Sequence, residues 1–335
     1  MFTKALYYPH IYLPDNVWLR RAILYWDQVN PIVPHGLRSR AAGDEVFQAL
    51  HAEGLSEWME PDDAMRGRRY EQLMSEFRGL VSSERYLASL GPRGRRKRDM
   101  RIFRDKIAYG LVEELRELGL VQGPDRQGWF HFEWGTGELY MGYLAAAIAQ
   151  SFGLEPLTDK REWQDSLLRS QLEEDDREQA FASFVLEGLI PTPRSDVGVA
   201  EIVAFRRRHE EELLRFRRAV RETVESLREV SDEVEVARKL DAVKDDVREQ
   251  SLALARKLGE NRIETGLSTL EVSVPAVAGL VAIGSWSVGA VLAGVGGVLK
   301  IGRQLLNGRI RKNSLLAENP YTYVYRIERE LVDQH

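Results

Sequence analysis

The stretch KALYYPHIYLPDNVWLRRAILYWDQVNPIVP, between Lys4 and Pro34, contains the clearest local signals of the fold. Residues 4–8 are rich in β-forming side chains and predict a strand. Asp15 or Asn16 then stands where a helix cap is expected, ahead of residues that repeat at helical spacing. The apolar face of this helix would consist of Trp18, Leu19, Ala22, Ile23 and Trp26. Because Pro31 ends the helix and the chain continues as a second strand, the stretch predicts the beginning of an α/β fold.

Short β-rich runs alternate with helical patterns as far as residue 195. These runs are PIVPHG, LSEWMEPDD, WFHFEW, EPLTD and FVLEGLIPTP. The alternation predicts an α/β domain over residues 1–195, with a mixed or mostly parallel sheet and helices packed on it. Within it, IFRDKIAYGLVEELRELGLV predicts an amphipathic helix and GELYMGYLAAAIAQSFG a buried helix ended by glycine. The run GPRGRRKRDMR predicts a loop, because Gly91, Pro92 and Gly94 disfavour helix.

The character of the chain changes after IPTPRSD. From Val199 onward, apolar side chains repeat every three to four residues, and a second such series begins near Asp232. Residues 196–262 therefore predict long, coiled-coil-like helices, and helices of this kind need a partner. We expect a second copy of the chain or another helical protein in that role. The side chains expected to mediate oligomerisation are Ile202, Phe205, Leu213, Phe216 and Val220.

Residues 263–335 predict an apolar helical hairpin followed by a C-terminal segment that returns to the body of the protein. The run VPAVAGLVAIGSWSVGAVLAGVGGVL, Val274–Leu299, contains no charge, and the whole uncharged stretch of residues 272–299 is long enough to span a membrane. Its many Gly and Ser residues make spontaneous insertion marginal and favour close helix packing instead. The residues expected to shape the hairpin are Gly284, Trp286, Gly289, Ala293 and Gly297. A packed hairpin, a hairpin that enters membranes only on activation, and a permanent span all remain open.

Composition and charge limit the classes of chemistry. With no cysteine in 335 residues, the chain has no disulfide, thiolate nucleophile or zinc–thiolate site, as suits a reducing cytoplasm. The net charge of −5 gives no general attraction to nucleic acid. A local exception is the basic run with Arg93, Arg95, Arg96, Lys97 and Arg98. Such a run can contact phosphates, but a solvated loop is the commoner explanation, so nucleic acid is not the expected partner. The first residues lack a secretory signal, which predicts a cytoplasmic protein that meets membrane only on activation.

Several polar side chains follow the predicted strands, where ligands gather at the carboxyl ends of parallel sheets. These candidates for acid–base chemistry are His10, His35, Glu60, Asp62, His131, Glu133 and Asp159. None of them has recognised metal-ligand spacing, so no metal is expected. The sequence also lacks a P-loop, a G-x-S-x-G elbow and kinase motifs, so it indicates no cofactor and no familiar hydrolase or kinase.

Three segments resemble an uncharacterised bacterial family known as domain of unknown function 6236. They are KALYYPHIYLPDNVWLRRAILYWDQVNPIVP, LIPTPRSDVGVAEIVAFRRRHEEELLRFRRAV and NPYTYVYRIERE. The resemblance implies a bacterial cytoplasmic protein, often encoded among mobile or accessory genes, and brings no catalytic residues. It favours a defence-related effector or interaction protein whose hairpin is membrane-active under some condition. The alternatives are a hydrolase-like α/β enzyme using the strand-end His and acidic residues, and a nucleic-acid-binding protein.

Overall fold

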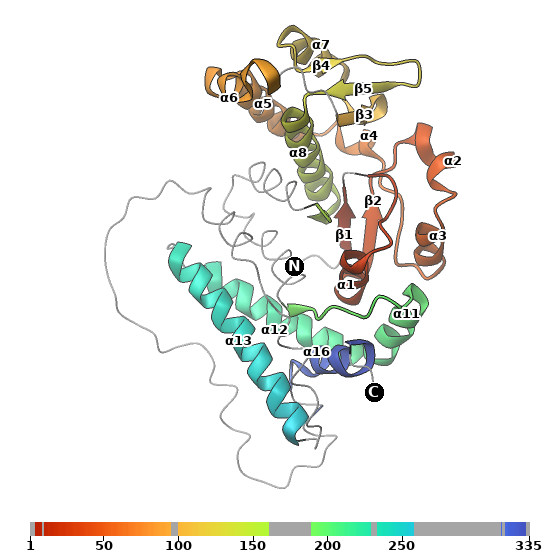
Figure 1. Cartoon of the computed structure of the whole chain (residues 1–335), viewed down its shortest axis with the longest axis vertical. Coiled ribbons are helices and arrows are strands. Elements are labelled where there is room, and N and C mark those ends of the chain that lie inside the picture. The colour runs from red at the N-terminus through yellow and green to blue at the C-terminus, as the bar shows by residue number, and fades with distance from the viewer. Residues whose placement is uncertain are drawn as a thin grey trace. The chain divides into compact units, whose positions relative to one another are not determined.

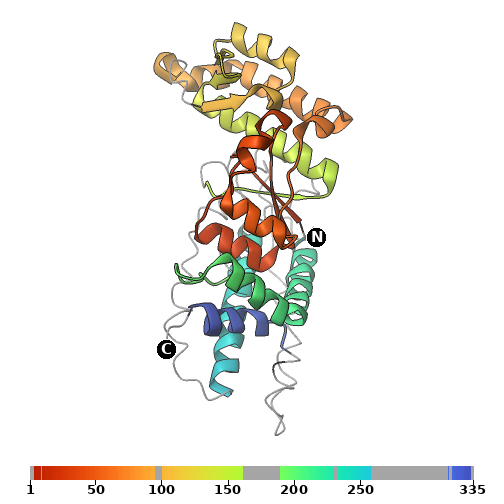
Figure 2. The ribbon, with the colours of Figure 1, turned by 90° about the vertical axis from the view of Figure 1, so that its right-hand side faces the viewer.

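The computed structural model describes residues 4–8, 10–94, 100–160, 189–228, 233–257, 316 and 319–332. The chain forms two compact units, residues 1–208 and 209–335 (Figures 1 and 2). Its described part is mixed α/β and mostly helical, with two small sheets. The predicted fold class is therefore confirmed at this level. The finer division at residues 195 and 262 stays a prediction.

A parallel three-stranded sheet begins the first unit, in the order β2–β1–β6. The central strand β1, Lys4–Tyr7, pairs with β2, Gln28–Pro31, on one side and with β6, Glu155–Leu157, on the other. Between β1 and β2 lies α1, Val17–Tyr25, and its N-cap is Asn16, whose side-chain oxygen accepts a hydrogen bond from the Leu19 amide at 3.1 Å. The predicted order of strand, helix and strand is thus confirmed, but the helix ends at Tyr25 and Pro31 lies within β2, so Pro31 does not end the helix.

The second sheet is antiparallel and also has three strands, in the order β3–β5–β4. These are β3, Met100–Phe103, β4, Val121–Gln122, and β5, Trp129–Phe132. The helix predicted from Ile102 is wrong in its first part, since that residue lies in β3 and the helix α7 spans only Tyr109–Glu117. The reason is the alternation of buried Met100, exposed Arg101 and buried Ile102, which suits a strand with one face on the core.

The helix α8, Trp134–Phe152, is the longest buried element of the first unit. It packs on β3 of the antiparallel sheet and on β1 and β6 of the parallel sheet (Figure 1). It ends at Gly153, whose φ of 62° is a left-handed cap, as the sequence predicted. Since one rigid helix contacts both sheets, it fixes the strand ends of one relative to the other.

The remaining helices of the first unit are short or lie on its surface. They are α2 Arg38–Ala41, α3 Glu45–Ala52, α4 Pro61–Ala64, α5 Arg68–Ser82, α6 Glu84–Gly94, α11 Val199–Arg208 and the 3-10 turns η1 His35–Leu37 and η2 Arg104–Lys106. The loop predicted at Gly91, Pro92 and Gly94 is wrong for these residues, because α6 continues to Gly94. Poor helix formers lower propensity without forbidding the last turn of an amphipathic helix.

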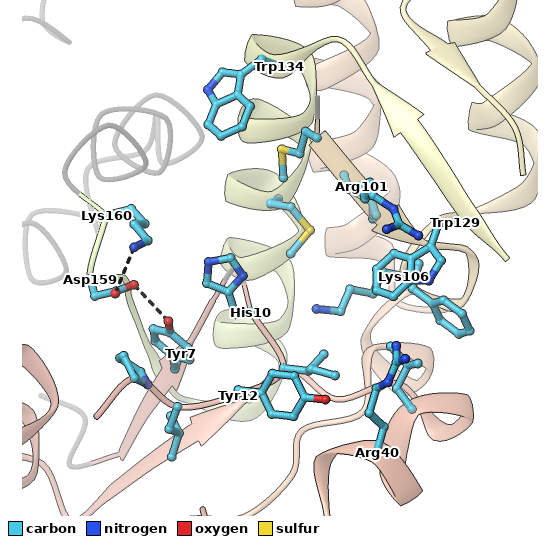
Figure 3. A pocket seen from close by; sticks show the side chains of 18 residues that line it. Tyr7, His10, Tyr12, Arg40, Arg101, Lys106, Trp129, Trp134, Asp159 and Lys160 are labelled. Atoms are coloured by element: carbon cyan, nitrogen blue, oxygen red, sulfur yellow. Dashed lines mark hydrogen bonds and ion pairs between the residues drawn. The ribbon is translucent and has the colours of Figure 1, made fainter. Parts of the chain in front are cut away.

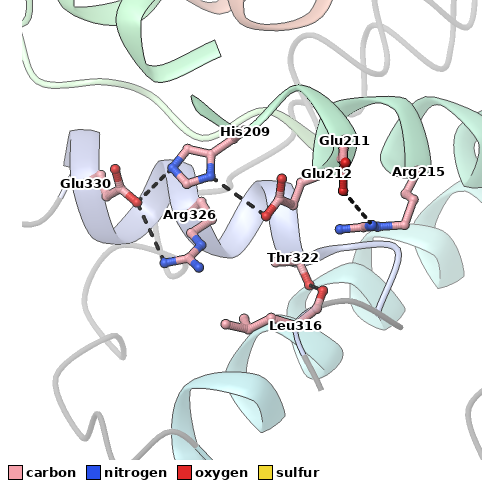
Figure 4. A network of polar contacts seen from close by, with 8 residues as sticks. All are labelled: His209, Glu211, Glu212, Arg215, Leu316, Thr322, Arg326 and Glu330. Carbon is pink, nitrogen blue, oxygen red and sulfur yellow. Dashed lines mark hydrogen bonds and ion pairs between the residues drawn. The ribbon is translucent and has the colours of Figure 1, made fainter. Parts of the chain in front are cut away.

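The second unit contains α12, Glu210–Arg228, α13, Glu233–Lys257, α16, Thr322–Ile327, and the π-helical turn η6, Glu328–Val332. Aromatic packing joins α12 and α16, since the ring of Phe216 stacks on Tyr323 at 6.2 Å between centroids. The buried His209 adds a polar link, with its Nε2 3.0 Å from Glu330 Oε1 (Figure 4). These contacts join the C-terminal segment to the beginning of this unit, and its return to the body of the protein stays a prediction.

The predicted oligomerisation side chains lie within the described residues, whereas the uncharged run does not. The side chains expected to oligomerise, Ile202, Phe205, Leu213, Phe216 and Val220, are all buried within the single chain. Their apolar area is already covered, and oligomerisation stays a prediction. The uncharged run 272–299, with Gly284, Trp286, Gly289, Ala293 and Gly297, lies outside the described residues. No helix within the described ranges combines the length and apolarity needed for a membrane span.

Candidate functional site

A cavity of about 570 Å³ opens at the carboxyl ends of β1 and β6 (Figure 3). His10 follows β1, while Asp159 and Lys160 follow β6, and all three line this strand-end pocket. The opposite wall comes from β3 and β5 of the antiparallel sheet, through Arg101 and Trp129 among others. In open α/β sheets, ligands bind in such a crevice at the carboxyl ends of the strands, at the point where the order of the strands in the sheet reverses.

The strand-end pocket contains four cationic side chains from four separate segments: Arg40, Arg101, Lys106 and Lys160. Three of them, Arg40, Arg101 and Lys106, lie on the same side of the cavity in Figure 3. Arg101 is held in place by Asp125, 3.3 Å away, and by the ring of Trp129, whose centroid is 5.0 Å from its guanidinium carbon. A positioned guanidinium of this kind suits recognition of a carboxylate or phosphate.

Asp159 is the carboxylate on the other side of the cavity. Its Oδ1 accepts a hydrogen bond from the Tyr7 hydroxyl at 3.0 Å, and its Oδ2 is 3.5 Å from the Lys160 amine. Burial and the neighbouring Asp159 charge both raise the pKa of Tyr7, so this phenol stays protonated and keeps donating. The arrangement holds Asp159 as a fixed negative charge beside an otherwise basic cavity.

His10 and Lys106 are the two bases of the strand-end pocket whose proton affinity departs from the ordinary range. Burial lowers the pKa of His10, with the charge of Asp159 opposing and those of Lys160 and Lys106 reinforcing the decrease. Lys106 is only 4% exposed. Burial lowers its pKa to about 7. Because desolvation disfavours the ammonium form, a large fraction of Lys106 is a neutral amine near neutral pH.

Aromatic side chains supply much of the remaining lining. Tyr12 and Trp134 are each 42% exposed, which is unusual for side chains of this size. Both line the strand-end pocket, on opposite sides of His10 in Figure 3. Exposed rings beside a cationic wall offer apolar contact to a ligand whose charged group reaches that wall.

The structure separates the predicted acid–base residues into five places. Only His10 and Asp159 line the strand-end pocket. His35 and Glu60 form a surface pair, 3.5 Å apart, in which Glu60 also contacts Arg38 at 2.8 Å. His131 on β5 lies 3.5 Å from Asp125. Asp62 is an exposed residue of α4.

Glu133 has a structural position. It is the N-cap of α8, and its carboxylate accepts hydrogen bonds from the Gly135 amide at 3.1 Å and from the Thr136 amide and hydroxyl at 2.7 and 2.8 Å. All of these stabilise the first turn of the helix, where backbone amides otherwise lack partners. This geometry uses Glu133 as a helix cap.

No local pattern marked Lys106, Arg101 or Arg40 as site residues. Each lies in a local pattern typical of a surface, and they line one cavity although they come from η2, β3 and α2. Of the predicted basic run, Arg93 lies in α6, whereas Arg95, Arg96, Lys97 and Arg98 lie outside the described residues. In the described ranges, no cluster of three or more His, Asp or Glu side chains has a metal-binding arrangement.

Comparison with known proteins identifies one relationship. The model of a family of unknown function, DUF6236, matches residues 165–332, half of the chain. No curated protein and no solved structure matches. The described residues that line the strand-end pocket all precede the matched segment, so the family match does not include them.

Proposed function

The chain belongs to the DUF6236 family of unknown function, and for its first unit we propose that the strand-end pocket binds a small organic anion. The observation that carries this proposal is the charge of the lining. Its cationic side chains are Arg40, Arg101, Lys106 and Lys160. Among the described lining residues, Asp159 is the one carboxylate. This local excess of positive charge contrasts with the net charge of −5 for the whole chain, and it favours anions over cations.

The size and walls of the strand-end pocket indicate a ligand of metabolite size. A cavity of about 570 Å³ falls in the range that encloses small organic molecules. Tyr12 and Trp134 offer rings to the apolar part of such a ligand, and Arg101 offers its guanidinium to the charged part. Recognition by a few placed polar groups within apolar walls is the common design of small-molecule sites.

The geometry gives less support to a hydrolase-like enzyme. In the described part of the chain, Asp159 bonds Tyr7 and pairs with Lys160, and no hydrogen bond joins it to His10. A His activated by a carboxylate is therefore not assembled in this arrangement. Binding accounts for the pocket without a requirement for acid–base catalysis by His10.

At the level of the whole protein, the proposal is a bacterial accessory or defence-related effector. The first unit would sense the anion, and the uncharged run 272–299 would respond as a packed hairpin that is released towards a membrane or a helical partner. The composition of that run supports this part of the proposal.

The test of anion binding is calorimetry with purified full-length chain against phosphate, nucleotides, dicarboxylates and oxo acids. We expect one class to bind, and Arg101→Gln to weaken that binding about 10- to 100-fold, because a charge-assisted hydrogen bond is lost. Arg78→Gln is the matched control. Arg78 lies on α5, outside the pocket, is about as exposed as Arg101, and pairs with Glu114 at 2.9 Å. Equal affinities for the two variants, or no binding by any anion, would overturn the proposal.

A further inference from the structure

Lys106 has an uncommon position for a lysine. It ends the 3-10 turn η2 directly after β3, and only 4% of it is exposed. Its backbone carbonyl accepts a hydrogen bond from the Tyr140 hydroxyl of α8, which fixes the turn against the buried helix. Figure 3 shows the side-chain amine directed towards the middle of the strand-end pocket, below His10. Lysine is rarely buried to this extent, and an amine that faces a cavity lies where a bound ligand can contact it.

The surroundings of this amine favour its neutral, nucleophilic form. Arg40 and Arg101 lie on the same side of the cavity, and burial removes water that would stabilise an ammonium ion. Burial lowers the pKa of Lys106 to about 7. Desolvation of this kind is one means by which proteins prepare a lysine for attack on carbonyl compounds.

The other lysine of the strand-end pocket is more exposed and has a carboxylate beside it. The Lys160 amine is 3.5 Å from Asp159 Oδ2, and its side chain is 45% exposed. An opposite charge and water both stabilise the ammonium form, which has no lone pair for attack. The pocket therefore contains one lysine suited to covalent chemistry and one suited to ion pairing.

We propose that Lys106 forms an imine with a small oxo acid bound in the strand-end pocket, with the acid's carboxylate beside Arg101 and Arg40. This inference rests on the proposed anion binding and names the ligand class: an anion that also has a carbonyl group. The carboxylate would use the cationic wall, and the carbonyl carbon would face the Lys106 amine.

The chemistry needs no reagent beyond the two partners. The lone pair of Lys106 Nζ attacks the carbonyl carbon, and the carbonyl oxygen takes up a proton as the nitrogen loses one. The resulting carbinolamine expels its hydroxyl group as water after protonation, and the nitrogen lone pair closes the C=N bond. Amine and ketone thus give imine and water, with no change in oxidation state.

The test is reductive trapping on the full-length chain. We would incubate it with pyruvate, glyoxylate or 2-oxoglutarate and sodium cyanoborohydride at neutral pH, then locate the adduct by peptide mass spectrometry. We expect a dominant single adduct on Lys106. Lys106→Arg should abolish it while keeping a positive charge in place, and Lys160→Arg should retain it. Lactate, an anion without the reactive carbonyl, should protect Lys106 in the wild-type chain, which gives a readout that needs no variant.

The outcomes separate this inference from the proposed function. Adducts spread evenly over surface lysines, or an undiminished adduct in Lys106→Arg, would overturn imine formation. If lactate nevertheless binds in calorimetry and Arg101→Gln weakens that binding, the anion site stands without the imine. If no oxo acid reacts at Lys106 and none of the anions binds in calorimetry, phosphate and nucleotides included, both proposals are overturned.

Discussion

Burial of the Lys106 side chain costs the folded protein free energy whenever the amine is protonated. The pKa of this amine is about 7 in the folded protein, against an ordinary value of 10.5. Between these values the unfolded chain binds a proton that the folded chain does not, so this residue makes stability rise with pH across that window. Below about pH 7 the cost is fully present, and above about pH 10.5 it has vanished.

We therefore expect Lys106→Met, which keeps a long aliphatic side chain, to raise the free energy of unfolding at neutral pH by on the order of a few kcal/mol. The gain should shrink as the pH approaches about 10, at up to roughly 1.4 kcal/mol per pH unit. Urea unfolding at several pH values measures both the gain at neutral pH and its decrease as the pH rises. Lys160→Met is the control, since that amine is partly exposed and ion-paired. A gain that does not change with pH would contradict the explanation from burial.

At the scale of elements, Glu133 illustrates how a candidate catalytic residue can be a structural one. Its carboxylate is buried and accepts three hydrogen bonds from the first turn of α8. We expect Glu133→Ala to lower the free energy of unfolding by about 1–2 kcal/mol, as for other helix caps. Glu133→Asp should keep most of the stability, because aspartate is a preferred cap.

The control for this measurement is Glu113→Ala on α7. Glu113 forms an exposed ion pair with Arg116 at 2.6 Å, and such pairs contribute little. Thermal or urea unfolding of Glu133→Ala, Glu133→Asp and Glu113→Ala would rank the three variants by stability. If Glu133→Ala were as stable as Glu113→Ala, the hydrogen bonds to Gly135 and Thr136 would not be what holds the start of α8.

The elements that the sequence predicted correctly are those with strong local signals. The cap at Asn16 and the apolar spacing behind it identified α1, and Gly153 identified the end of α8. The strand β3 was missed because it has only four residues. With exposed or basic residues beside it, so short a segment resembles the start of the helix that follows. Its identity as a strand depends on pairing with β5, which is far along the chain.

The candidate site was predictable only where it follows a strand of the parallel sheet. His10 and Asp159 were found by this rule, since β1 and β6 are neighbours and their carboxyl ends meet at one edge. Arg101 and Lys106 come from the antiparallel sheet and its following turn, and α8 brings that wall to the pocket. No local pattern predicts this packing, so the cationic character of the site required the structure.

At the scale of the whole molecule, the family match and the strand-end pocket concern different parts of the chain. The match begins at residue 165, and the last described residue that lines the pocket is Lys160. The matched segment includes α11 in the first unit and the helices of the second, where His209, directly before α12, contacts Glu330 of the C-terminal turn (Figure 4). We expect a response to the anion in a segment other than the described lining of the pocket.

The uncharged run 272–299 is the proposed site of that response, and its removal tests the proposal. We expect the full chain to distribute partly to the membrane fraction of expressing cells and to impair growth, and a chain lacking residues 272–299 to do neither. Anion binding in the first unit should be the same in both. Gly289→Leu with Gly297→Leu is the matched variant, since it raises apolarity while blocking close helix approach. This variant should enter membranes more readily if packing restrains the run, whereas identical fractionation of all three chains would contradict a conditional membrane role.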